Sequence, residues 1–205
     1  MGELILEIFG TVTGLLYVWL EIKHRRSMWI VGIVMSVCYV VVFGVEALYA
    51  SMGLYVYYLG MSLYGWFKWS AKTQQRQQQR PDSNPERNPD FTLDPNPERI
   101  PVHIDASTAW MTAGLLVVVF SGVWAVLRFL TDHPAPAMDA AITTFNMVAT
   151  WLLTKSILEQ WLLLMVANIL AIILYAHTGL WFTTGLYTVY LIASVIGYIN
   201  WRRKI

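Results

Sequence analysis

Residues 155–175 read KSILEQWLLLMVANILAIILY, an apolar run of membrane length with the amide of Asn168 near its middle. Burying an unpaired amide in hydrocarbon is costly, so Asn168 is expected to face a protein interior or a water-filled cavity. At about 100° per residue, Trp161, Leu164, Asn168 and Tyr175 share one helical face. The ring, amide and phenol on this face suit a flat polar ligand. The alternative is that Asn168 only hydrogen-bonds a neighbouring helix.

The composition is that of an integral membrane protein. Hydrophobic residues make up 57% of the 205 residues and charged residues 13%, against about 25% charged in soluble domains. The ten Trp and eleven Tyr fit this class, because both favour the bilayer interface. The single Cys38 lies in an apolar run, so neither a disulfide framework nor a cysteine metal site is expected. No basic surface for nucleic acid is present, and no cofactor or metal is expected. The first ten residues lack the pattern of a cleaved signal peptide.

The chain is predicted to be all-α, with seven segments long enough to cross the bilayer. Thr143, Thr144, Asn146 and Thr150 make the fifth segment unusually polar, which favours a position lining a cavity over one facing lipid. The predicted spans are 3–22, 28–46, 52–70, 107–130, 138–155, 158–176 and 180–201.

A glutamine- and proline-rich stretch separates the third and fourth spans. Residues 71–106 bury too little apolar surface to order themselves and are predicted to form a flexible cytoplasmic linker. The expected organisation is therefore a first three-helix unit (1–70), the linker (71–106), a connecting helix (107–131) and a second three-helix unit (132–205). If the spans alternate, every Lys and Arg except Arg128 falls on one side, which places the amino terminus outside and the carboxyl terminus in the cytoplasm.

An internal repeat is predicted from a gapless shift of 132 positions. The two three-helix units would then run parallel, which requires the fourth span to cross the membrane as a connector and gives a 3+1+3 arrangement. Parallel repeats are typical of transporters that bind substrate between the halves near mid-membrane. The shift superposes, among others, Trp19 on Trp151, Lys23 on Lys155, Trp29 on Trp161, Ser62 on Ser194, Gly65 on Gly197 and Trp69 on Trp201.

Candidate binding residues follow from this layout. Asn168 superposes on Ser36, and Asn146 lies at similar depth in the fifth span, so the three form a possible polar waist. Ser36 has an alternative role, because a serine can bond to its own helix carbonyl. Three tyrosines are candidates to close the outer end of the site, and an interfacial aromatic belt is their alternative role. These are Tyr55, Tyr58 and Tyr187.

The sequence resembles the PnuC-type vitamin transporters over both three-helix units. The resemblance implies a SWEET-like fold, a homotrimer in the bacterial inner membrane, and facilitated diffusion with alternating access. It also implies intracellular trapping of the vitamin by phosphorylation, and hence a functional link to a cytoplasmic kinase. The second unit carries most of the pattern, in Asp139-Ala140, Thr143-Thr144, Ala149, Trp151-Leu152, Lys155, Glu159, Trp161, Asn168, Tyr175, Gly179-Leu180, Tyr187, Gly197 and Trp201. The first unit adds Tyr49-Ala50, Tyr57-Tyr58, Tyr64-Gly65-Trp66 and Trp69.

Family members that carry nicotinamide riboside share a W-x-x-W-x-x-x-N pattern. The similar stretch in this sequence is Trp161-x-x-Leu164-x-x-x-Asn168. The resemblance implies that Trp161 stacks on the substrate and that Asn168 orients it. Leu164 replaces the second Trp, Tyr55 stands where Gln is common, and Ser51 stands where Asp is usual. Nicotinamide riboside and thiamine, both flat cationic aromatics, are therefore the two expected substrates, and riboflavin is a third.

Other classes fit less well. The four histidines lie outside the spans or at their ends, and no phosphate loop or Ser-His pair appears, so an enzyme is not expected. A retinal protein is not expected, because it would need a lysine within residues 180–200, and these residues contain none. Proton or sodium coupling usually relies on an intramembrane carboxylate at mid-depth, and none is expected there, which favours transport without ion coupling. Asp139 and Glu159 stand at helix starts, where a carboxylate interacts with the helix dipole, although coupling through them is an alternative.

Overall fold

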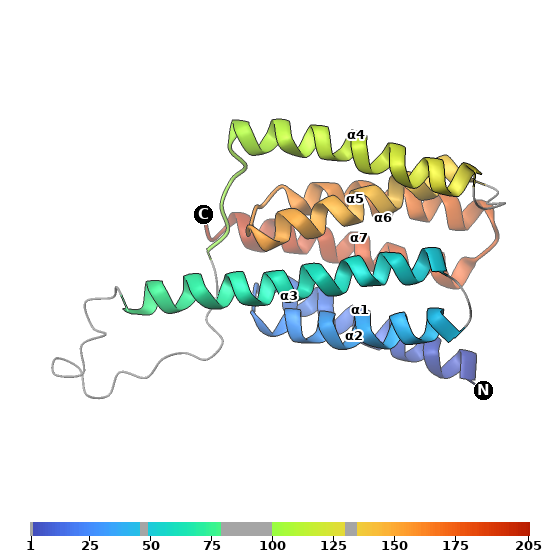
Figure 1. Ribbon diagram of the computed structural model, residues 1–205, viewed down its shortest axis with the longest axis horizontal. Coiled ribbons are helices and arrows are strands. Elements are labelled where there is room, and N and C mark those ends of the chain that lie inside the picture. The colour runs from blue at the N-terminus through green and yellow to red at the C-terminus, as the bar shows by residue number, and fades with distance from the viewer. Residues whose placement is uncertain (1, 46–48, 79–99, 130–134) are drawn as a thin grey trace. The chain divides into compact units, whose positions relative to one another are not determined.

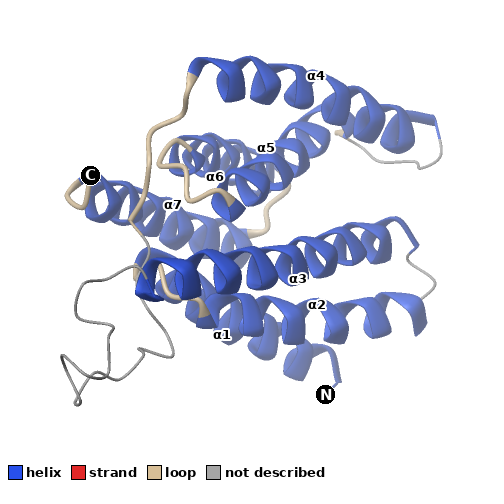
Figure 2. Ribbon diagram, turned by 60° about the vertical axis from the view of Figure 1, so that its left-hand side comes forward, coloured by secondary structure: helices blue, strands red, loops and turns tan. Residues whose placement is uncertain are grey.

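The computed structural model describes residues 2–45, 49–78, 100–129 and 135–205, and these form seven α-helices (Figures 1 and 2). The prediction of an all-α protein with seven helices is confirmed. Each helix begins within three residues of its predicted span. The helices are α1 (Gly2–Ile22), α2 (Ser27–Val45), α3 (Tyr49–Gln78), α4 (Ala106–Phe129), α5 (Pro136–Thr154), α6 (Gln160–His177) and α7 (Trp181–Arg202).

Helix α3 is longer than the sequence indicated. It continues to Gln78, eight residues past the predicted span of 52–70 and into the segment expected to form the linker. The residues 71–78 are mostly Ala, Lys, Gln and Arg, which favour helix, and the first proline comes only at Pro81. Of the predicted linker, residues 79–99 lie outside the described residues.

Chain contacts divide the molecule into two compact units, residues 1–99 and 100–205. In the first unit, α2 packs against both α1 and α3. In the second, α4 packs on α5, α5 on α6, and α6 on α7. The connecting helix expected at 107–131 therefore packs as part of the second unit. The parallel 3+1+3 arrangement of the two units stays a prediction.

Three of the described helices, α4, α6 and α7, are long and apolar enough to span a membrane. Shorter apolar stretches, Thr11–Ile22 and Ser27–Val42, lie in α1 and α2. Large apolar side chains of α4 such as Trp110, Val118 and Phe129 are well exposed, as expected for a surface that faces lipid.

In the second unit, α6 and α7 meet at a tryptophan ring packed on a glycine. The Trp161 side chain is fully buried, and a Cβ placed on Gly197 would lie 2.5 Å from its ring. The ring of Trp201 closes the contact edge-on, with centroids 5.5 Å apart and planes at 90°. Only glycine lets the helix backbone come this close.

The first unit contains the same contact between α2 and α3. A Cβ on Gly65 would lie 2.6 Å from the ring of the fully buried Trp29. Trp69 meets Trp29 edge-on, with centroids 5.4 Å apart and planes at 87°. Each of these three residues stands 132 positions before its counterpart in the second unit.

The loops that lead into α2 and α6 also share their geometry. His24 and Ser156, again 132 positions apart, have positive φ angles of 55° and 60°. The N–H of His24 donates to the Glu21 carbonyl at 2.9 Å, and that of Ser156 donates to the Leu153 carbonyl at 2.8 Å. A left-handed residue thus turns the chain at the same point in both units.

The tryptophan–glycine contact predicts a sharp difference between two alanine substitutions on α7. Gly197→Ala forces the Trp161 ring to move and should destabilise the protein by about 1–3 kcal/mol, as overpacking does. Gly185→Ala is the matched control, because a Cβ there meets nothing within 4 Å. Thermal unfolding in detergent measures both; equal midpoints for the two variants would contradict the contact.

Candidate functional site

Asn168 forms a hydrogen bond between α6 and α7. Its side chain is buried, and Nδ2 donates to Ser194 Oγ at 3.1 Å. Ser194 Oγ in turn donates to the Tyr190 carbonyl in its own helix at 2.8 Å. The amide therefore has the helix-to-helix role that the sequence offered as its alternative. Its predicted contact with a ligand stays a prediction.

Trp161 and Leu164 lie on the same helix as Asn168. The Trp161 ring packs toward α7 on Gly197, and its Nε1 has no hydrogen-bond partner among the described residues. Leu164, one turn further along α6, is half-buried. Stacking of Trp161 on a substrate would require a ring face other than the one on Gly197.

The other two members of the predicted polar waist lie on different helices. Asn146 on α5 is half-buried, and its Nδ2 donates to the Ile142 carbonyl of the same helix at 2.8 Å. Ser36 on α2 is buried in the first unit. The structure thus gives Asn146 a bond within its own helix, with further hydrogen-bonding capacity on the amide.

Tyrosine rings cluster near the start of α7. Tyr187 stacks on Tyr175 of α6, with centroids 5.2 Å apart and planes at 29°. Tyr190 meets Tyr187 edge-on at 5.8 Å. Tyr175 and Tyr187 also pack against the buried cluster that includes Ile142. The predicted outer residue Tyr187 is therefore held in an aromatic stack.

The first unit has a comparable cluster. Tyr55 and Tyr58 on α3 contact each other with ring centroids 5.9 Å apart. Tyr39 of α2 lies over Tyr55 at 4.6 Å, and Tyr57 meets Tyr58 edge-on at 5.6 Å. Aromatic faces of this kind attract flat cations, which is the property that the predicted site needs.

Sequence reasoning missed several polar atoms buried in the second unit. Both amide atoms of the fully buried Gln160 and the hydroxyl of Thr144 have no hydrogen-bond partner among the described residues. Each such group costs about 1–3 kcal/mol when it stays unpaired. Gln160 was missed because it stands at a helix start, where hydropathy carries no information on burial. These atoms, with Trp161 Nε1, keep unused hydrogen-bonding capacity inside the packed helices.

Ser194 was also absent from the predicted site, although the repeat pairs it with Ser62. No group of three or more His, Cys, Asp or Glu side chains that could hold a metal ion occurs in the described ranges.

These features define a helical membrane protein with buried polar and aromatic groups inside its helix packing. The family model described as "Nicotinamide mononucleotide transporter" matches residues 4–203. The nicotinamide riboside transporter PnuC of Escherichia coli (strain K12) is 24% identical over 190 residues, which cover 86% of this chain and 76% of that protein. The protein of the same name in Haemophilus influenzae is 27% identical over 203 residues, covering 98% and 80%.

A crystal structure of the vitamin B3 transporter PnuC is also similar. It matches with a TM-score of 0.65 and 25% identity, over 95% of this chain and 79% of that one. The chain belongs to the PnuC-type family of vitamin transporters, as the sequence pattern indicated.

The Asn168–Ser194 hydrogen bond predicts energetic coupling between the two residues. A double-mutant cycle with Asn168→Leu and Ser194→Ala should give a coupling free energy of about 0.6–2 kcal/mol, typical of such bonds in membranes. In the control cycle, Thr184→Ala takes the place of Ser194→Ala. The Thr184 hydroxyl donates to the Leu180 carbonyl of its own helix. Unfolding in mixed detergent micelles measures both cycles, and equal coupling in the two would contradict the bond.

Proposed function

We propose that this protein carries nicotinamide riboside across a bacterial inner membrane by facilitated diffusion. The relatives that match most of the chain are nicotinamide riboside transporters, which favours this substrate over thiamine. The observation that carries the proposal is the buried Asn168 amide on α6, within the pattern Trp161-x-x-Leu164-x-x-x-Asn168.

The chemistry of the amide suits a carboxamide ligand. Nicotinamide carries a C=O and an NH₂, which pair with the donor and the acceptor of an asparagine side chain. Binding would exchange the single Asn168–Ser194 bond for two bonds to the ligand. Ser194 Oγ would keep its bond to the Tyr190 carbonyl, so no hydroxyl proton would be left unpaired.

The charge of the pyridinium ring can be met by aromatic faces. A cationic ring that enters hydrocarbon loses its hydration, and tyrosine or tryptophan rings offset part of that cost without a fixed counter-charge. The tyrosine clusters around Tyr55 and Tyr187 supply such faces in each unit. We assign these clusters to the outer approach to the site.

Alternating access would come from the two three-helix units moving against each other. Support for the underlying repeat comes from the tryptophan–glycine contacts and the left-handed loop residues, which recur 132 positions apart. We further propose that the amino terminus lies outside, that the protein forms a homotrimer, and that a cytoplasmic kinase traps the substrate. The first rests on the distribution of Lys and Arg, and the other two rest on the family resemblance.

Thiamine is the second candidate substrate. Leu164 offers no aromatic face where the family pattern has a second Trp, and Tyr55 is held between two tyrosines where a glutamine is common. Both differences remove contacts of the nicotinamide riboside pattern, and thiamine is likewise a flat aromatic cation.

Calorimetry on the detergent-purified protein separates the two substrates. If nicotinamide riboside is the ligand, it should bind more tightly than thiamine, and Asn168→Leu should weaken it by about 10- to 100-fold through loss of two hydrogen bonds. Leu164→Trp should tighten it by about 2- to 30-fold by restoring a cation–π face.

Leu162→Trp is the matched control for the second variant, because Leu162 is exposed on the other side of α6. Tighter binding of thiamine, unaffected by Asn168→Leu, would overturn the assignment of the substrate and of the amide.

A further inference from the structure

Residues 100–105, just before α4, form a strap across the loop between α5 and α6. The Val102 N–H donates to the Ser156 carbonyl at 2.9 Å, and the Leu158 N–H donates to the Val102 carbonyl at 2.9 Å. Val102 and Ile157 thus form an isolated parallel β-bridge. The end of the predicted linker is therefore bound to the second unit.

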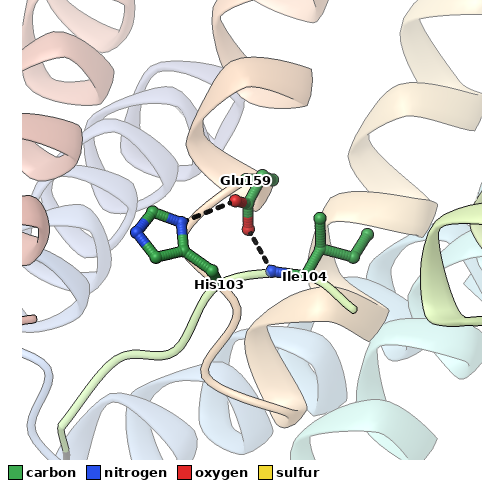
Figure 3. A network of polar contacts seen from close by, with 3 residues as sticks. All are labelled: His103, Ile104 and Glu159. Atoms are coloured by element: carbon green, nitrogen blue, oxygen red, sulfur yellow. Dashed lines mark hydrogen bonds and ion pairs between the residues drawn. The ribbon is translucent and has the colours of Figure 1, made fainter. Parts of the chain in front are cut away.

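The carboxylate of Glu159 contacts two further residues of the strap, His103 and Ile104 (Figure 3). Glu159 Oε1 contacts His103 Nδ1 at 3.0 Å, and Oε2 accepts the Ile104 N–H at 3.0 Å. Glu159 stands at the N-cap of α6, as the sequence predicted, but its oxygens bind the strap and make no side-chain cap bond. This carboxylate thus adds two side-chain contacts to the two backbone hydrogen bonds of Val102 that hold the strap.

The loop beneath the strap is closely packed. Ser156 has a positive φ of 60°, and Ser156, Ile157 and Leu158 are all buried. Gln160 and Trp161, the first residues of α6, follow directly and are fully buried. The strap therefore closes over the start of the helix that carries Asn168.

The corresponding loop of the first unit has no carboxylate at the position of Glu159. Its backbone turns in the same way at His24, but Ser27 stands 132 positions before Glu159. A serine hydroxyl has one oxygen on a short side chain, so it cannot hold a ring nitrogen and a backbone N–H as a carboxylate does.

We propose that Glu159 is a positioning residue for transport: it holds the strap on the α5–α6 loop throughout the cycle and so keeps the start of α6 fixed in the second unit. The effect of Glu159 on transport rests on the proposed function, whereas the contact between Glu159 and the strap does not. The motion that opens the cytoplasmic side would then occur without release of the strap.

Substitution of Glu159 tests whether its contacts with the strap matter for transport. Glu159→Ala should lower the maximal rate of nicotinamide riboside uptake about tenfold with little change in KM, because α6 loses its fixed orientation. Glu159→Gln should keep most of the rate, since its oxygen can accept the Ile104 N–H and its NH₂ can donate to His103. Equal rates for wild type and Glu159→Ala would overturn the proposal.

A cross-link tests whether the strap stays closed. Bridged β residues lie within reach of a disulfide, so Val102→Cys and Ile157→Cys can be joined in a Cys38→Ser background. Oxidation should leave uptake unchanged and should restore it when Glu159→Ala is also present. Loss of uptake on oxidation, reversed by a reductant, would show that the strap must open and would overturn the proposal.

Hydrogen exchange gives a readout that needs no substrate. The Val102 and Leu158 N–H groups should exchange slowly in the wild type and in Glu159→Gln, and faster in Glu159→Ala. If the wild type carried no nicotinamide riboside, the proposed function would fail while this measurement still decided whether Glu159 holds the strap. Equal exchange in all three proteins would contradict the claim that Glu159 holds the strap on the α5–α6 loop.

Discussion

The packing of an indole ring on a glycine determines how close the helices of each unit can come. In the second unit the contact joins Trp161 to Gly197, and Trp201 closes it edge-on. Asn168 lies seven residues further along α6 and Ser194 three residues back along α7, so the same approach brings the amide to the hydroxyl. A side chain on the glycine would displace the Trp161 ring and so disturb this approach.

The membrane explains why polar residues inside the spans have such different roles. Without water, a hydroxyl must find a partner in the protein, and a carbonyl four residues earlier in the same helix is always near. Asn168 departs from this pattern because its bond crosses to another helix. Among the described residues, the hydroxyls bonded to the carbonyl four residues earlier include those of Thr112, Ser121, Thr150, Thr184, Thr188 and Ser194.

Hydropathy located the helices well, because the length of an apolar run is a direct measure of a span. It failed at the end of α3, where Ala71 to Gln78 are polar yet favour helix. The strap was missed for a related reason: residues 100–105 follow a proline-rich stretch, and their partners in the α5–α6 loop and at Glu159 are more than fifty residues away. The repeat had paired Trp29 with Trp161 and Gly65 with Gly197, but no sequence pattern told which ring would meet which glycine.

In the proposed function, this family member moves nicotinamide riboside without an ion gradient. Counterflow into proteoliposomes tests it most directly: vesicles preloaded with unlabelled nicotinamide riboside are diluted into a trace of labelled compound with no proton or sodium gradient. Facilitated diffusion of nicotinamide riboside predicts a transient accumulation of label that decays to equilibrium and is lost in Asn168→Leu. Accumulation that required an imposed gradient, or that occurred with thiamine and not with nicotinamide riboside, would contradict it.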